Sequence, residues 1–283
     1  MVPQLKKTAY FSIIFLGVFL ASLLFGDPAL GDIFKIHPLE VIEIMDYGEV
    51  NWSKMTIRAK GDGIPNPQVS ELSRATLGAD QEAKQEALNN LLKTIKAVPI
   101  DSRTTFQQKI KESDVISSKV QELVRNAEII ETTYFSDGGV KIVVNLPLSG
   151  PLINLILPTT ERTVPVTTDK KKYTGMIIDV RGLKAAPVLA PKIMDEEGKE
   201  VYGSSFISLE GLGKWGVAKY LRDLSSSQKD DRVGKNPLLV KGLRATGPRS
   251  GDIIISNADA QKILGFINDQ GFLRNGEVII IIN

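Results

Sequence analysis

The chain has 283 residues, 42% hydrophobic and 24% charged, which is ordinary for a globular protein and excludes wholesale disorder. Its net charge of +2 comes from basic residues interspersed with acidic ones, so it lacks the basic footprint of a nucleic-acid-binding protein. The absence of cysteine excludes disulfides, thiolate metal sites, cysteine nucleophiles and a lipidated N-terminal cysteine, and a single histidine excludes any site that needs two.

The N-terminus carries the pattern of an export signal. Two lysines precede an apolar run over residues 9–25, which a Gly-Asp-Pro sequence ends. Ala29 and Gly31 are small residues at the positions that a signal peptidase reads. We therefore expect a signal peptide over residues 1–31 that is cleaved before Asp32. The alternative is that the same segment is kept as a membrane anchor, and in both cases the rest of the chain is exported to the periplasm or cell envelope.

Two strands are predicted next. An apolar patch over residues 39–44 favours an opening strand. Residues 49–60 favour a second strand, with a break in the alternation at Ser53 and Lys54 that indicates a bulge or a bend. The glycines of residues 61–63 are expected to end it.

Two helices follow these strands. Gly78 favours a break in the first helix, and Pro99 ends it. In residues 101–112, the threonines favour a strand and the second half favours a helix, so a strand and a helix both remain possible there. Ser113 is expected to cap the second helix. The first helix shows apolar residues at steps of three and four, and its stripe consists of Leu72, Ala75, Ala79, Ala83, Ala87, Leu91, Ile95 and Val98.

A β-hairpin completes the first domain. Its strands are expected over residues 128–135 and 140–148, around a turn at residues 136–139. Two helices with apolar stripes and a hairpin with an apolar face bury their surfaces only against each other. Residues 32–149 therefore predict an α+β domain in which two helices pack on a small mixed sheet.

The remainder predicts a linker and a second domain. Residues 150–172 are rich in proline and threonine and are expected to be the linker. Residues 173–283 predict a β-rich domain with one helix, over residues 257–268, and a final strand at 277–282 that is apolar on both faces and should lie centrally. Earlier strands of this domain are expected at residues 173–181, 188–194, 200–209, 238–245 and 252–256.

The most specific motif has the glycine spacing of a dinucleotide-binding loop. It covers residues 211–216, and an acid follows about 20 residues later at Asp230 or Asp231. That acid lies in a polar loop rather than at the end of a strand, and Trp215 crowds the position where the backbone should approach a pyrophosphate. A glycine-rich turn is the better interpretation, and no cofactor is expected.

Other candidate motifs are weaker. The Ser-Lys spacing of residues 226–229 lacks the companion motifs of penicillin-binding enzymes. Residues 195–197 are acidic but lack the alternating ligands of a calcium loop, so a solvated turn explains them. His37 has no partner for catalysis, and residues 170–172 are three solvated lysines. We therefore predict no catalytic residue, no cofactor-binding residue and no metal ligand.

Residues 57–148 resemble the LPP family of bacterial envelope lipoproteins, to which flagellar basal-disk protein P is similar. The resemblance implies a compact α+β domain of the cell envelope, often built into assemblies near the flagellar motor, and a scaffold rather than an enzyme. Without a cysteine to carry lipid, the chain departs from the family, which favours a soluble periplasmic form. The segments that carry the resemblance are residues 57–63, 79–95, 112–116, 120–127 and 136–139.

Three functions follow from these observations. The first is an exported structural or assembly protein of the cell envelope, associated with motility, that binds envelope or flagellar proteins and itself. The second is a periplasmic module that recognises a glycan or a peptide between its two domains. A hydrolase that uses scattered carboxylates is the least favoured. Membrane attachment is expected only through an uncleaved N-terminal segment.

Overall fold

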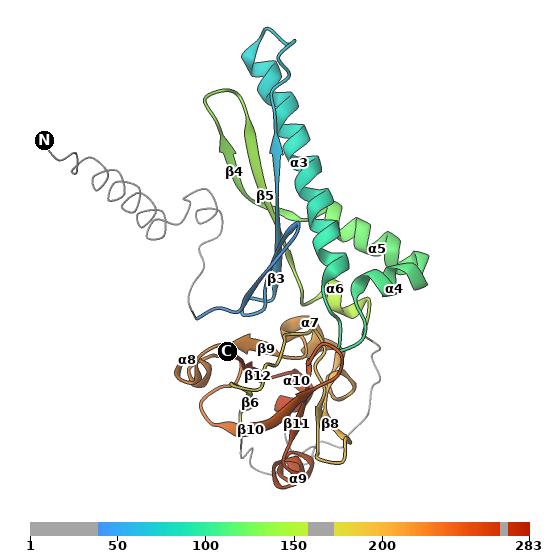
Figure 1. Cartoon of the computed structure of the whole chain (residues 1–283), viewed down its shortest axis with the longest axis vertical. Coiled ribbons are helices and arrows are strands. Elements are labelled where there is room, and N and C mark those ends of the chain that lie inside the picture. Colours follow the sequence, from blue (N-terminus) through green and yellow to red (C-terminus); the bar gives the residue numbers. More distant parts are fainter. Residues whose placement is uncertain (1–38, 158–172, 267–270) are drawn as a thin grey trace, which may run out of the picture. The chain divides into compact units, whose positions relative to one another are not determined.

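A computed structural model describes residues 39–157, 173–266 and 271–283 (Figure 1). Their strands form two separate sheets, and the helices pack around them, so the α+β class is confirmed. We call residues 39–157 the N-lobe and residues 173–283 the C-lobe. The predicted signal peptide, His37, the three lysines of residues 170–172 and most of the predicted linker lie outside the described residues.

The N-lobe contains a five-stranded sheet in the order β1-β2-β3-β5-β4. Every neighbouring pair is antiparallel, whereas a mixed sheet was predicted. Its elements are β1 (Ile42–Met45), β2 (Gly48–Asn51), β3 (Thr56–Gly63), α3 (Leu72–Ala97), α4 (Phe106–Glu112), α5 (Asp114–Arg125), β4 (Glu128–Tyr134), β5 (Val140–Pro147) and the short α6 (Pro151–Asn154).

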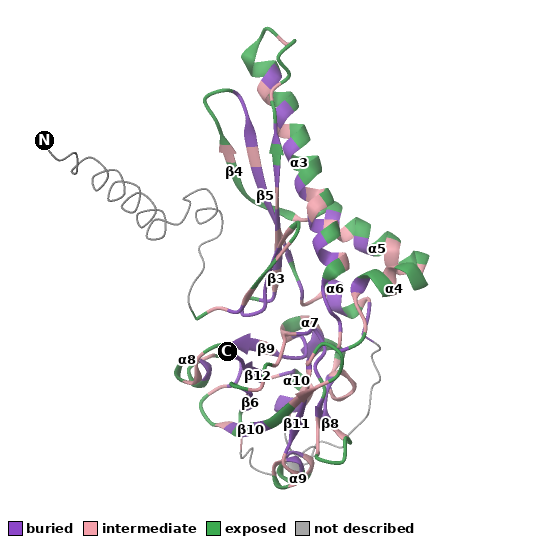
Figure 2. Cartoon of the chain, in the orientation of Figure 1, coloured by how far each residue is buried: buried purple, intermediate pink, exposed green. Residues whose placement is uncertain are grey.

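Helix α3 packs on the sheet through its alanine stripe, which Figure 2 shows as a buried face turned toward the strands. The alanines recur every four residues, so they lie on one side of the helix. Gly61 and Gly63 of β3 face them: a Cβ on Gly63 would lie 2.6 Å from the carbonyl carbon of Ala79. Strand β3 ends within the predicted segment, at Gly63, but it includes residues 61–63 instead of stopping before them, because these glycines bring its backbone against α3.

The segment predicted as one bulged strand forms two. Strands β2 and β3 pair antiparallel, and the four residues between them form a tight turn. The irregularity predicted at Ser53 and Lys54 is therefore real, but it reverses the chain instead of bending it. Met55 closes the turn with φ 55°, a left-handed conformation that is uncommon outside glycine.

The helices also depart from the prediction in detail. Helix α3 continues through Gly78, where an added Cβ would meet nothing within 4 Å, so no break is needed. Leu72 is 59% exposed and does not belong to the buried stripe. Residues 101–112 resolve into a loop and α4, whose first turn has a capping box at Thr105. Ser113 accepts a hydrogen bond from the backbone N–H of Ile116, as expected for the cap of α5.

The C-lobe contains a seven-stranded mixed sheet in the order β8-β7-β11-β10-β6-β12-β9. Its strands are β6 (Gly175–Asp179), β7 (Ile193–Met194), β8 (Glu200–Tyr202), β9 (Lys219–Leu221), β10 (Pro237–Thr246), β11 (Asp252–Ile255) and β12 (Val278–Ile281). Its helices are η1 (Ser204–Phe206), α7 (Leu209–Trp215), α8 (Leu224–Gln228), α9 (Asn257–Phe266) and α10 (Gly271–Asn275). The prediction of a single helix in this domain is wrong. The helices other than α9 were missed because each is only one or two turns long, too short for a helical period to show in the sequence.

The final strand lies inside the sheet, as predicted. Strand β12 pairs in parallel with β6 on one side and β9 on the other, and all four of its residues are buried. Strand β6 is likewise paired in parallel on both sides. Two-sided burial explains why β12 and the first four residues of β6 carry no polar side chain.

A buried arginine joins the loops of the C-lobe. Arg232 is 2% exposed and donates to the carbonyl oxygens of Gly276 (2.9 Å), Trp215 (2.7 Å) and Gly216 (3.2 Å). Its guanidinium carbon also lies 5.8 Å from the centre of the Trp215 ring. Burial lowers the pKa of Arg232 to about 10, so the side chain stays charged at neutral pH. One side chain thus holds the ends of α7 and α10 together.

The two lobes share a continuous core. Trp52 of the N-lobe is fully buried and meets the ring of Tyr220 edge-on, with 5.8 Å between ring centres. Ser53 donates a 2.7 Å hydrogen bond to the carbonyl oxygen of Tyr220. In α6, Leu152 and Ile153 are buried within the same core. The part of the predicted linker that is described therefore packs against the protein.

Candidate functional site

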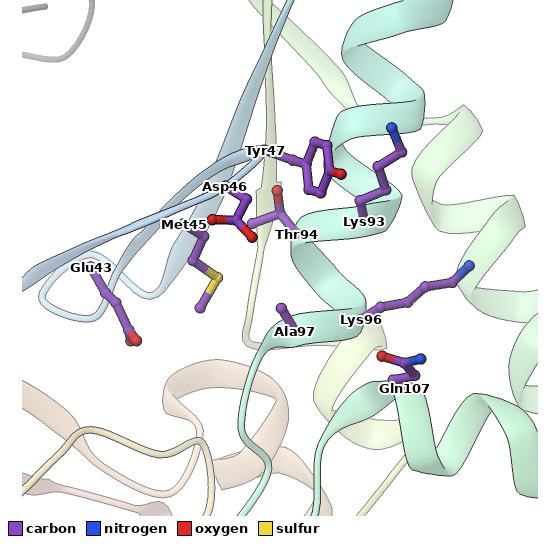
Figure 3. A pocket seen from close by; sticks show the side chains of 9 residues that line it. All are labelled: Glu43, Met45, Asp46, Tyr47, Lys93, Thr94, Lys96, Ala97 and Gln107. Atoms are coloured by element: carbon purple, nitrogen blue, oxygen red, sulfur yellow. The ribbon is translucent and has the colours of Figure 1, made fainter.

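A polar pocket of about 480 Å³ lies within the N-lobe (Figure 3). It is formed by the β1–β2 hairpin, the last turns of α3 and the start of α4. Its volume falls in the range of about 300–1,000 Å³ that is usual for small-molecule sites. The lining residues are Glu43, Met45, Asp46, Tyr47, Lys93, Thr94, Lys96, Ala97 and Gln107.

The charges of this pocket are divided between its two sides. Glu43 and Asp46 come from the β1–β2 hairpin, whereas Lys93 and Lys96 come from α3, as Figure 3 shows. The hairpin's own Tyr47 lies under the Lys93 ammonium, 4.3 Å from Nζ to the ring centre. This stacking holds the lysine without neutralising it.

Two pocket side chains are held by hydrogen bonds within the protein. One oxygen of Glu43 accepts a 3.0 Å hydrogen bond from the indole N–H of Trp52, which is fixed in the core between the lobes. The Thr94 hydroxyl donates to the carbonyl oxygen of Asn90 within α3. Asp46 and Lys96 make no ion pair with any other described residue. Their charges remain available to a ligand.

A second feature is the outer edge of the N-lobe sheet, strand β4. It pairs with β5 on one side and with no described strand on the other. Six of its seven residues are exposed, including Ile129 and Ile130 at 41% each and Tyr134 at 63%. The register against β5 shifts between Ile129 and Glu131, which indicates a β-bulge at Ile130. We call residues 128–134 the open edge.

A row of polar side chains crosses the sheet on the face opposite α3. Glu49, Arg58 and Asn145 occupy directly paired positions on β2, β3 and β5. Glu49 is 1% exposed, and neither carboxylate oxygen has a hydrogen-bond partner; its ion pair with Arg58 is long, at 3.8 Å. Burial raises the pKa of the Glu49 carboxyl above its usual 4.5, and Arg58 opposes this rise only in part.

This raised pKa predicts a pH effect on stability. Because folding raises the Glu49 pKa, the ionised carboxylate destabilises the folded state. This destabilisation is present at neutral pH and disappears as the pH falls through the folded-state pKa toward 4.5. We expect the substitution Glu49→Gln to raise the melting temperature relative to the native chain by more at pH 7 than at pH 4.5. Thermal unfolding followed by circular dichroism at both pH values measures this difference. A difference of the same size at both pH values would contradict it.

The glycine-rich motif does not form a phosphate-binding loop. Gly211 and Gly213 lie inside α7, whereas the dinucleotide fingerprint requires a loop between a strand and a helix. A Cβ on Gly211 would lie 2.5 Å from the carbonyl oxygen of Arg274, so this glycine permits close packing against α10. The predicted glycine-rich turn is also wrong, since the segment is helical up to Trp215.

The other weighed motifs have structural roles. Ser226 donates two hydrogen bonds, from its backbone N–H and its hydroxyl, to the Asp223 carboxylate that caps α8, so its hydroxyl is not poised beside Lys229. Glu196 accepts a hydrogen bond from the backbone N–H of Asn257 at the start of α9. Asp230 forms an ion pair with Lys219. No group of three or more potential metal ligands was found in the part of the chain that the structure describes.

The pocket residues were not found from the sequence. Their side chains come from the β1–β2 hairpin, from the last turns of α3 and from the start of α4, where acidic and basic residues are ordinary. No motif joins residues 43–47 to residues 93–107.

In the described helices, no segment is long and apolar enough to cross a membrane.

The fold and site define a two-domain α+β protein with a polar pocket and an open sheet edge. Residues 175–283 match the family model of the second domain of the Treponema pallidum protein Tp0624. The match begins at the first residue of β6 and therefore includes every strand of the C-lobe. No curated protein matches the chain. The LPP resemblance of residues 57–148 stays a prediction.

Proposed function

We propose that this chain is an exported structural or assembly protein of the cell envelope, associated with motility, that acts by binding other proteins. The observation that carries the proposal is the open edge, an exposed strand whose outer backbone groups have no strand partner in the described chain. Such an edge accepts an extended segment of another protein by main-chain hydrogen bonding. The resemblance of residues 57–148 to envelope lipoproteins supports the same function.

The charges of the open edge favour a basic partner. Glu128 and Glu131 are both exposed on β4, and the strand carries no basic residue. Pairing β4 over its full length with β4 of a second copy would place Glu131 opposite Glu131, and like charges in that position destabilise a strand pair. The favoured occupant is therefore an extended segment of another envelope or flagellar protein with lysine or arginine at alternate positions.

Apolar side chains beside the edge add contact area. Ile129, Ile130 and Tyr134 are exposed on β4, and Phe135 follows at 45% exposure. Tyr134 is held by a 3.3 Å hydrogen bond from its hydroxyl to Asp80 on α3. Exposed apolar residues gathered along an unpaired strand are a hazard for a monomer, and a partner strand would cover them.

Site-specific photocrosslinking in cells tests this proposal. A photoreactive phenylalanine analogue at Ile130 should crosslink to an envelope or flagellar protein, through a segment rich in lysine or arginine. The same analogue at Leu239, which is 50% exposed on β10 of the C-lobe, is the matched control and should not give this product. Equal products from both positions, or none from Ile130, would refute docking at the open edge. A product with a second copy would favour self-association instead.

A charge reversal sharpens the same test. Glu131→Lys should lower the yield from Ile130 about tenfold, because it places a positive charge opposite the basic partner. Glu122→Lys, on the exposed side of α5, changes the net charge equally and should leave the yield unchanged. If the two variants behave alike, the partner is not selected by the charges of β4.

A second candidate function is recognition of a periplasmic ligand, a glycan or a peptide. The observation that favours it is the polar pocket of the N-lobe. Such a site was predicted between the two domains, whereas all residues that line this pocket belong to the N-lobe.

A further inference from the structure

We propose that the pocket of the N-lobe binds a small zwitterionic molecule of the peptide class, one that carries a free ammonium group and a free carboxylate. The inference rests on the second candidate function, ligand binding, and is independent of docking at the open edge. It deepens that function by choosing between a peptide and a glycan.

The division of charge in the pocket carries this choice. Its hairpin side presents the carboxylates of Glu43 and Asp46, and its α3 side presents the ammonium groups of Lys93 and Lys96. A ligand with a single sign of charge would meet repulsion from one of the two sides. A neutral sugar would use neither side. A molecule with opposite charges at its two ends matches both.

The bonding state of these groups supports the assignment. Asp46 and Lys96 make no ion pair with another described residue, so a ligand does not have to break one. Glu43 is oriented by Trp52 through one oxygen, and Lys93 is held over Tyr47. The site thus combines two charged side chains that are held in place with two that can reorient to contact the ligand.

The floor and rim suit the middle of a peptide. Met45 and Ala97 supply apolar surface between the charged sides, and Gln107 of α4 carries an amide that both donates and accepts hydrogen bonds. An amide group between two charged ends would meet these side chains. Since Glu43, Asp46 and Lys93 are exposed and Lys96 is half-buried, binding should weaken as the ionic strength rises.

Isothermal titration calorimetry with the purified full chain at low ionic strength tests the proposal. The probes are trialanine with free ends, N-acetyl-trialanine, trialanine amide and the neutral disaccharide chitobiose. Trialanine should bind, and blocking either end should weaken its affinity about tenfold, since each end loses a charge-assisted contact. Chitobiose should bind weakly or not at all.

Variants assign each end of the ligand to one side. Asp46→Asn should weaken trialanine about tenfold but leave N-acetyl-trialanine unaffected, whereas Lys96→Met should weaken trialanine but not its amide. Lys84→Met, on the exposed surface of α3 outside the pocket, is the matched control and should change nothing.

The outcomes separate this inference from the function on which it rests. Tighter binding of chitobiose than of trialanine would keep ligand recognition and overturn the zwitterionic assignment. Equal affinity for free and blocked peptides, or trialanine binding that neither pocket variant weakens, would also overturn it. No saturable binding of any probe would reject both the inference and the ligand-binding candidate.

Discussion

Replacing Gly63 by alanine is expected to destabilise the protein by about 3 kcal/mol or more. A Cβ at this position would lie 2.6 Å from the carbonyl carbon of Ala79 and 2.9 Å from the amide nitrogen of Ala83. Both contacts are with the backbone of α3, so no side-chain rotation relieves them. The helix and the strand must separate, and the alanine stripe then loses its close packing.

Urea denaturation followed by tryptophan fluorescence, to which the buried Trp52 of the N-lobe and Trp215 of the C-lobe contribute, measures this loss. Gly78→Ala is the matched control, on the helix against which Gly63 packs. An added Cβ there meets nothing within 4 Å, so this substitution should stabilise the protein by about 1 kcal/mol through helix propensity. A Gly63→Ala variant as stable as the native chain would show that β3 and α3 do not require contact between their backbones.

The second large effect is expected for Arg232→Met, a loss of about 3 kcal/mol or more. Methionine fills part of the volume but leaves the carbonyl oxygens of Trp215, Gly216 and Gly276 without their donor. Each buried unpaired group costs about 1–3 kcal/mol. Arg232→Lys should rescue little of this loss, because one ammonium group does not reproduce the planar fork that reaches three acceptors.

Thermal unfolding of these variants tests the role of Arg232. Arg249→Met, an exposed arginine in the loop between β10 and β11, is the control and should change stability by less than about 0.5 kcal/mol. If Arg232→Lys were as stable as the native chain, a single positive charge rather than the three directed hydrogen bonds would hold α7 and α10 together.

Much of the N-lobe was predictable because its elements are long and periodic. The alanines at every fourth position of α3 predicted the buried face, and the hairpin of β4 and β5 was found within one residue at each strand end. The C-lobe was less predictable. Its α7, α8 and α10 have five to seven residues each, too short for a helical period to show.

The errors in the N-lobe have a common cause. Gly61 and Gly63 look like residues that stop a strand before them, yet both are paired within β3, which ends at Gly63, because α3 lies against its backbone. Gly78 looks like a helix break, yet α3 continues because that position faces open space. The local preference of glycine is the same at all three positions, and the neighbouring element decides its role.

The sequence by itself determined the α+β class, the face that α3 buries, the hairpin and the central position of the last strand, since each depends on a repeat along one segment. The tertiary structure alone decided that residues 49–60 fold back on themselves, that Arg232 bridges three carbonyl groups and that Asp46 and Lys96 line one pocket. These features join residues far apart in the chain. A local pattern does not record which segments the packed core brings together.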